Sequence, residues 1–101
     1  MKNSIKTDNN EFQIILSDRL TFEDHEDFRD VISGIKKCDQ PSCAIDLCNL
    51  KAIDSAGLGM LMIAFETAEK AKKKFKLKRP NGQVKRLLEI SEFDKVMTIE
   101  T

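Results

Sequence analysis

The sequence contains no tryptophan, no tyrosine and only one histidine, His25, among its 101 residues. Most acid–base and nucleophilic catalysis uses histidine, tyrosine or a bound metal together with a second titratable group. A chain with one histidine and no tyrosine is poorly equipped for such chemistry. We therefore expect a protein that is not an enzyme, with no catalytic residue and no cofactor.

Cysteine is also scarce, and its three positions fit no common pattern. Cys38, Cys43 and Cys48 form an odd set with spacings of five, whereas a disulfide framework needs pairs and a metal knuckle uses CxxC. On a strand over 42–48, Cys43 and Cys48 would point to opposite faces, so they would not converge on one metal. We expect reduced cysteines that act as small buried apolar residues.

The chain has no net charge and no long apolar run. Its formal charge is zero, which gives no overall attraction to nucleic acid or membrane. The longest apolar run, 56–65, is about half of a bilayer crossing, and the N-terminal residues lack the apolar centre of a signal peptide. We therefore expect a cytoplasmic protein. The length predicts one domain over 1–101, and 34% charged with 41% apolar residues suits a soluble globular protein.

Apolar periodicity predicts alternating strands and helices, and hence an α/β sheet with right-handed crossovers. Strands are expected at 4–6, 11–16, 42–48 and 75–78, with a last extended piece at 96–99. Helices are expected at 23–37 with Thr21 as the cap, at about 57–73, and at about 83–91. His25 lies at the edge of the first apolar helix face, where a partly covered surface histidine is the expected environment.

The helix predicted at 57–73 is apolar on more than one side. Leu58, Leu61, Met62 and Phe65 form the expected inward stripe, and Met60, Ile63 and Ala64 are apolar as well. Two interpretations remain open. Either neighbouring helices flank this helix, or part of its surface is kept for a partner, for which the flexible methionines are suited.

The segment "AIDSAGLGML", residues 52–61, resembles several catalytic or phosphate-binding motifs only in part. Met62 replaces the third small residue of a dinucleotide-binding loop, and no GK[ST] follows the glycines as in a P-loop. A hydrolase elbow needs glycine where Ile53 stands, and its histidine follows the serine, whereas His25 precedes Ser55. We interpret Gly57 and Gly59 as allowing an unusual turn and a close contact, and Ser55 as a helix cap.

Seven basic residues lie between Lys70 and Arg79 and raise the possibility of phosphate contacts. Only Phe75 interrupts them, without further aromatic residues for base stacking. Lysines also stabilise the C-terminus of a helix. A solvated helix end is therefore the favoured interpretation, and we expect no nucleic-acid partner.

The segment "CAIDLCNLKAIDSAGLGML" resembles the signature of STAS domains, the group that contains bacterial anti-sigma factor antagonists. An apolar strand ends in Asp-Leu-Cys and is followed by Asp-Ser-Ala-Gly-Leu-Gly and an apolar helix. The resemblance extends to "SDRLTF" and to "RPNGQVKRLLEIS", so it covers nearly the whole chain. It implies one domain with a mixed four- to five-stranded sheet and helices mainly on one face.

The resemblance also implies a site and partners. The serine after the aspartate, here Ser55, is phosphorylated in the family by a serine/threonine kinase that is also the anti-sigma factor, and a PP2C-type phosphatase, in some systems part of a response regulator, removes the phosphate. Asp54 would belong to the same site, Gly57 would shape the turn, and Asp46 and the loop 17–21 would lie near the partner surface. The implied partner-binding residues are Asp18, Arg19, Thr21, Asp46, Asp54, Ala56, Gly57, Leu58 and Met60.

The chain departs from the family pattern at several points. Asp18 stands where many members have glycine, "SEF" at 91–93 replaces Thr-Gly-Leu, and Gly82 occupies the middle of the Pro-x-Val spacing. These differences bear on partner identity. Similar short members act on regulators other than sigma-factor inhibitors, including proteins that control biofilm formation or motility, and a binding module of that kind is the alternative to an anti-sigma factor antagonist.

Overall fold

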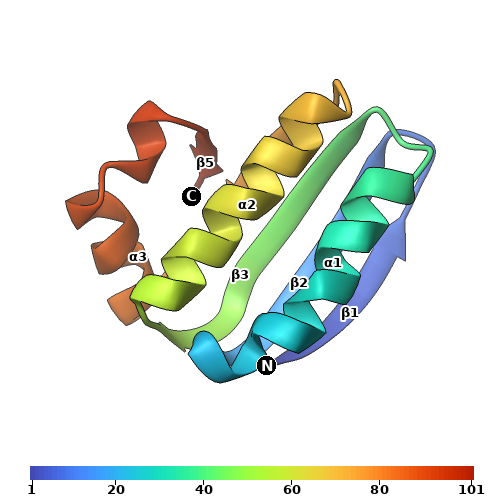
Figure 1. Ribbon diagram of the computed structural model, residues 1–101. Helices are drawn as coiled ribbons and strands as arrows, with labels where there is room; N and C mark the ends of the chain where they lie inside the picture. The colour runs from blue at the N-terminus through green and yellow to red at the C-terminus, as the bar shows by residue number, and fades with distance from the viewer.

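Five strands form one mixed sheet in the computed structural model, which describes residues 1–101 (Figure 1). The strands are β1 (Lys2–Thr7), β2 (Glu11–Leu20), β3 (Ser42–Ile53), β4 (Lys74–Lys78) and β5 (Thr98–Glu100). They lie in the order β1-β2-β3-β4-β5. β1 runs antiparallel to β2, and every other neighbouring pair is parallel. The mixed sheet predicted from the sequence is confirmed.

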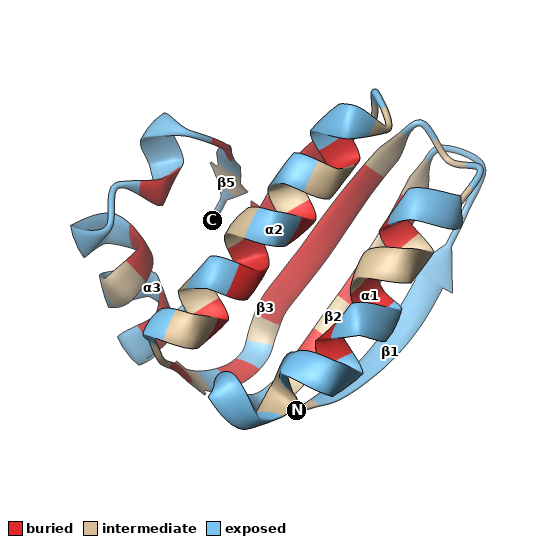
Figure 2. Ribbon diagram, viewed as in Figure 1, coloured by how far each residue is buried: buried red, intermediate tan, exposed pale blue.

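Helices connect the parallel strands, because a parallel neighbour can be reached only by a crossover. They are α1 (His25–Lys37), α2 (Ser55–Lys70) and α3 (Gly82–Ile90), with two 3₁₀ turns, η1 (Phe22–Asp24) and η2 (Phe93–Lys95). α1 and α2 lie side by side on one face of the sheet (Figure 1). Figure 2 shows that their buried residues face the sheet, whereas β1 at the edge is exposed. The prediction of helices mainly on one face is confirmed.

The core lies between α1, α2 and the sheet face that they cover. Phe12, Ile14 and Leu16 alternate along β2 and are all buried, as the sequence pattern predicts. Phe28, Val31 and Ile35 form the buried stripe of α1, with Ile32 half-buried beside them. None of the helices is long and apolar enough to cross a lipid bilayer.

Two strands extend further than the sequence pattern predicts. β2 continues through the predicted loop 17–21 as far as Leu20, and β3 continues through the predicted connection 49–55 as far as Ile53. The pairing of β2 with β3 shifts register between Ile15 and Ser17 and again between Asp18 and Arg19. Because each shift interrupts the two-residue alternation, these strand ends carry no recognisable strand pattern.

Helix α2 begins at Ser55 and ends at Lys70, instead of spanning the predicted 57–73. Its buried residues are Gly57, Met60, Leu61, Ala64 and Ala68, whereas Leu58, Met62 and Phe65 are half-buried. The predicted stripe packs against the core, but only Leu61 of its four residues is fully buried, while Met60 and Ala64 outside the stripe are buried as well. Ile63 remains 51% exposed, so the flanking helix α1 accounts for only part of the apolar surface.

The prediction that the lysine run is a solvated helix end holds only for its beginning, because α2 ends at Lys70. Its second half forms β4, close to the strand predicted at 75–78, and Lys74, Lys76 and Lys78 alternate with the buried Phe75 and Leu77. Lys78 Nζ lies 2.7 Å and Lys76 Nζ 3.6 Å from the Glu11 carboxylate on the sheet face that lacks helices. These lysines therefore belong to a charged network of the open sheet face. The cysteine prediction also holds only in part, since Cys43 is buried but Cys38 and Cys48 are half-buried.

Candidate functional site

Ser55 is the first residue of α2 and is exposed to solvent. It follows the carboxyl end of β3, and β2 ends beside it because Leu20 pairs with Ile53 in the parallel register. Both α1 and α2 therefore begin at the same edge of the sheet. Ligand and partner sites in open α/β sheets form at such carboxyl edges, where loops and helix N-termini converge. The arrangement makes Ser55 the centre of the candidate site.

Asp54, and not Ser55, caps α2. The backbone of Asp54 is extended, and its Oδ1 accepts a hydrogen bond from Gly57 N at 2.8 Å. Its Oδ2 accepts a second one from Phe22 N at 3.2 Å, and its own N donates to Leu20 O at 3.3 Å. The prediction of Ser55 as the cap was wrong, because aspartate is as good a cap and stands one residue earlier. The Ser55 hydroxyl is thus not needed for capping.

Gly57 permits the close contact between α2 and the end of β2. A Cβ atom at Gly57 would lie 2.3 Å from Leu20 O and 2.5 Å from Ile53 Cγ1, which no side chain tolerates. Gly57 therefore shapes this turn by its small size, without a left-handed backbone. Gly59 makes no such contact within the chain, since a Cβ there would meet nothing within 4 Å, so a close contact at Gly59 with a partner stays a prediction.

Gln83, which sequence reasoning missed, joins α3 to the same edge. Its Oε1 accepts a hydrogen bond from Ile53 N at 2.9 Å, and its Nε2 donates to Ile53 O at 3.1 Å. The side-chain amide thus pairs with the last residue of β3 as a neighbouring strand would. Only the position of glutamine directly after the "PNG" turn could have signalled this contact.

The other predicted residues of this edge lie at the end of β2. Thr21 caps the 3₁₀ turn η1 and not α1 as predicted, because α1 begins only at His25 with Asp24 as its cap. Thr21 N donates to Asp24 Oδ2 at 2.8 Å. Arg19 and Asp18 are exposed. Asp18 has φ of 76°, a left-handed conformation that glycine adopts most readily and aspartate tolerates. A glycine at the position of Asp18 would adopt this backbone without strain.

Asp46 is not part of this edge. It is fully buried on the middle of β3, beside Ile15 and Lys78 in register, on the sheet face opposite the helices. It pairs with Arg79 and accepts from Cys48 N at 3.0 Å and Gln13 Nε2 at 3.4 Å. Burial raises the pKa of Asp46, but the hydrogen bonds from Arg79 and Cys48 outweigh it and hold the pKa below its usual value of 3.8. The structure places a structural ion pair at this position.

An apolar groove lies between the first half of α1 and the middle of α2. We call it the α1–α2 groove, and it is a cavity of about 290 Å³ lined by His25, Phe28, Arg29, Ile32, Met60 and Ile63. Phe22, at its entrance, is 66% exposed and stacks on His25 with ring centroids 5.1 Å apart. Of the remaining predicted residues, Ala56 and Leu58 are half-buried at the start of α2, and Met60 is buried. Sequence reasoning missed Phe22 because it lies in a short turn without periodicity.

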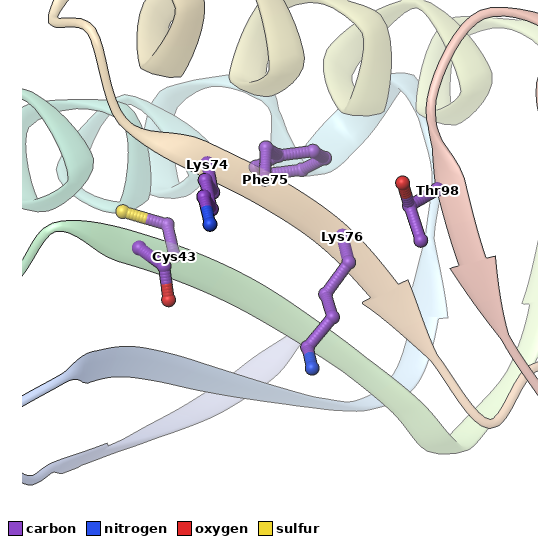
Figure 3. A pocket seen from close by; sticks show the side chains of 6 residues that line it. Cys43, Lys74, Phe75, Lys76 and Thr98 are labelled. Carbon is purple, nitrogen blue, oxygen red and sulfur yellow. The ribbon is translucent and has the colours of Figure 1, made fainter.

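A second cavity, of about 210 Å³, lies where β5 diverges from β4 (Figure 3). Cys43, Lys74, Phe75, Lys76 and Thr98 line it together with Ser42. Its walls contain none of the predicted site residues, and two lysines on strand β4 give it a basic character. The candidate site is therefore the carboxyl edge with the α1–α2 groove.

Comparison with known proteins shows the family of the chain. The model of the family described as "Mlab, STAS domain" matches residues 3–99. The chain belongs to the STAS domain family. A STAS-domain-containing protein of Pseudomonas aeruginosa is 29% identical to this STAS domain over 91% of the chain and 90% of its own length.

Solved structures share the STAS fold at low sequence identity. A candidate anti-sigma factor antagonist of Thermotoga maritima has a TM-score of 0.87 and 20% identity, and the match covers 98% of this chain and 86% of that one. The anti-sigma factor antagonist SpoIIAA in its unphosphorylated form has a TM-score of 0.79 and 16% identity, with 99% and 89% covered. The phosphorylated form of SpoIIAA from Bacillus has a TM-score of 0.73 and 19% identity, and the match covers 99% of this chain and 92% of that one.

Proposed function

We propose that this STAS domain is a regulatory protein controlled by phosphorylation of Ser55 and similar to anti-sigma factor antagonists. It binds a serine/threonine kinase of the anti-sigma factor type, or an equivalent regulator, while Ser55 is unmodified, and releases it after phosphorylation. The observation that carries the proposal is the position of Ser55, exposed at the start of α2, directly after the cap Asp54 and at the same edge of the sheet as Phe22. The hydroxyl is accessible to a kinase and borders the surface that a partner would cover.

The effect of the phosphate follows from its charge. Phosphoserine carries about −1.5 to −2 charges at neutral pH, which need water or basic groups around them. At the N-terminus of α2 the free backbone N–H groups and the helix dipole stabilise an anion, so the fold itself tolerates the modification. A partner packed on Phe22 and the groove would instead have to desolvate the phosphate beside the Asp54 carboxylate. The modification therefore acts on the contact and leaves the domain folded.

The surroundings of Ser55 support a substrate of phosphorylation more than a nucleophile. A serine nucleophile needs a base within hydrogen-bond reach. The single histidine, His25, has its Nδ1 2.9 Å from the Phe22 carbonyl oxygen and its ring stacked on Phe22. His25 is thus held by its own helical turn. Under this proposal the domain is not an enzyme and needs no cofactor, and ATP is bound by the kinase.

The comparisons support the same kind of partner. SpoIIAA is an anti-sigma factor antagonist that has been solved in phosphorylated and unphosphorylated forms, and both have the fold of this chain. In the proposed cycle, which takes place in the cytoplasm, a PP2C-type phosphatase, alone or in a response regulator, removes the phosphate from Ser55 and restores binding.

Binding of the domain to the anti-sigma-type kinase from the same genome tests the proposal. We expect Ser55→Ala to bind as tightly as the wild type in the presence of ATP, and Ser55→Asp to bind at least about tenfold more weakly. Incubation with kinase and ATP should add one phosphate to the wild type and none to Ser55→Ala. Ser91→Asp, a change at an exposed serine after α3, is the matched control and should bind normally. Equal binding by Ser55→Ala and Ser55→Asp would contradict the proposal.

A further inference from the structure

Two of the three cysteines lie close together at the end of the sheet opposite Ser55. Cys38 caps the C-terminus of α1, and Cys43 is the second residue of β3. Their sulfur atoms are 3.6 Å apart, which is within hydrogen-bond distance for thiols. Cys43 also lines the cavity beside β5, and in Figure 3 its sulfur points away from Lys76 and Thr98.

A lysine from a third element contacts this pair. Lys73, in the segment after α2, places its Nζ 3.0 Å from Cys38 Sγ and also donates to the Cys38 carbonyl oxygen. Cationic neighbours of this kind accompany reactive cysteines, because they stabilise a negatively charged sulfur. The fold thus brings two thiols and one ammonium group together from the ends of α1 and α2 and the beginning of β3.

We propose that Cys38 and Cys43 are a redox-sensitive thiol pair, which a peroxide oxidises to an intramolecular disulfide. In the first step the Cys38 sulfur attacks the peroxide ROOH, the O–O bond breaks, and Cys38 becomes a sulfenic acid while ROH leaves. In the second step the Cys43 sulfur attacks the Cys38 sulfur, the S–O bond breaks, and the hydroxyl leaves with the Cys43 proton as water. The pair loses two hydrogens, and the peroxide is the oxidant.

The environments of the two sulfurs determine the order of these steps. Cys38 is half-buried and in contact with Lys73, so a small oxidant can reach it. Cys43 is buried, and burial, followed by the hydrogen bond and the charge of Cys38, raises the pKa of Cys43 to about 12. Cys43 therefore remains a thiol while Cys38 reacts. Once Cys38 is oxidised, its hydrogen bond and negative charge no longer raise the pKa of Cys43, and the positive charge of Lys73 then favours the Cys43 thiolate.

The connection between the cysteines allows the bond to form. A disulfide needs about 2.05 Å between sulfurs, so the two side chains must approach by roughly 1.5 Å. Only residues 39–42 separate them, and Asp39 and Pro41 in this turn are exposed. Cys48 is not involved, because it lies five residues further along β3 beside Asp46 on the other face of the sheet. Cys48 serves as an internal control.

Stoichiometric oxidation with hydrogen peroxide, followed by peptide mass spectrometry under non-reducing conditions, tests the pair. We expect a loss of two hydrogens and a Cys38–Cys43 bond in both the wild type and Cys48→Ala. Cys43→Ala should accumulate a sulfenic acid at Cys38 that dimedone traps. Lys73→Met should slow the reaction roughly fivefold relative to Lys70→Met, a change at an exposed lysine of α2.

Three outcomes would overturn the proposal. These are oxidation of Cys48 before Cys38, a disulfide between two chains in place of the internal bond, and full retention of all three thiols in the wild type under peroxide. Because the wild type and Cys48→Ala alone distinguish these outcomes, misfolding of Cys43→Ala would not prevent a decision. The test uses no kinase, so its result is independent of the phosphorylation proposed for Ser55.

Discussion

The carboxylate of Asp54 joins the first turn of α2 to the backbone of Phe22, 32 residues earlier in the chain. One oxygen accepts from Gly57 N at 2.8 Å, and the other accepts from Phe22 N at 3.2 Å. The helix that carries Ser55 and the aromatic side chain at the entrance of the α1–α2 groove are thereby held together by a single residue. The position of Asp54 beside the serine thus has a structural reason in addition to any role in binding.

Replacement of Asp54 should destabilise the fold by the loss of these hydrogen bonds. We expect Asp54→Ala to lower the free energy of unfolding by about 1–2 kcal/mol, the usual effect of removing a helix cap. Asp54→Asn should cost less, since its side-chain oxygen can still accept from Gly57 N. Urea denaturation followed by circular dichroism measures the free energy of unfolding of both variants. Equal losses in the two variants would show that capping is not the main contribution of Asp54.

The two glycines after Ser55 should respond in opposite ways to alanine. Gly57→Ala places a methyl group against Leu20 O and Ile53 Cγ1, so we expect a loss of about 1–3 kcal/mol in the free energy of unfolding. Gly59→Ala meets no atom within 4 Å and lies inside a helix, so we expect a gain of about 0.5–1 kcal/mol. Thermal or urea unfolding of the pair is the measurement, and a destabilising Gly59→Ala would be inconsistent with this packing.

The ion pair between the buried Asp46 and the largely exposed Arg79 should make stability depend on acid pH. Because the folded pKa of Asp46 lies below 3.8, its contribution is present above pH 3.8 and is lost as the pH falls through the folded value. We expect Asp46→Asn to lower the free energy of unfolding by about 1–2 kcal/mol at pH 7, allowing for the exposure of Arg79. The difference from the wild type should shrink below pH 4. A difference that stays constant from pH 7 to pH 3 would exclude this contribution.

The entrance of the α1–α2 groove should contribute to partner binding without contributing to the fold. We expect Phe22→Ser or Ile63→Ser to weaken binding of the kinase by roughly tenfold, because exposed apolar anchors supply much of the affinity of an interface. Ile90→Ser is the matched control, since Ile90 is 68% exposed on α3, outside this edge. Calorimetric titration gives the affinities, and unfolding curves should show little change in stability. Equal effects of Ile63→Ser and Ile90→Ser would place the contact elsewhere.

Local sequence patterns predicted the parts of the fold in which periodicity is uninterrupted. Phe12, Ile14 and Leu16 alternate on β2, and Phe28, Val31 and Ile35 recur with helical spacing on α1, so both elements were recognised. The ends of β2 and β3 were missed because the register shifts around Ser17 and Asp18 interrupt the alternation. Sequence alone does not show where such a shift occurs, because it depends on pairing with another strand.

The candidate site was predicted in part. The motif predicted that Ser55 lies at the start of a helix. It did not show whether Asp54 or Ser55 is the cap, because aspartate and serine are both favoured at that position and only the backbone geometry decides between them. The approach of Cys38 to Cys43 depends on how the turn between a helix and a strand folds back, and no spacing rule encodes it. Burial on α2 was misjudged because Ala64 and Met60 face a helix whose orientation is a tertiary property.

The side-chain amide of Gln83 couples α3 to the strand that precedes Ser55. It makes hydrogen bonds with both the N–H and the carbonyl group of Ile53, which lies two residues before Ser55 at the end of β3. Slow hydrogen exchange at the Ile53 amide would therefore report on α3 as much as on the sheet. A shift of Ile53 caused by a change at Ser55 would therefore act directly on the Gln83 side chain, and Gln83→Ala would remove this connection between β3 and α3.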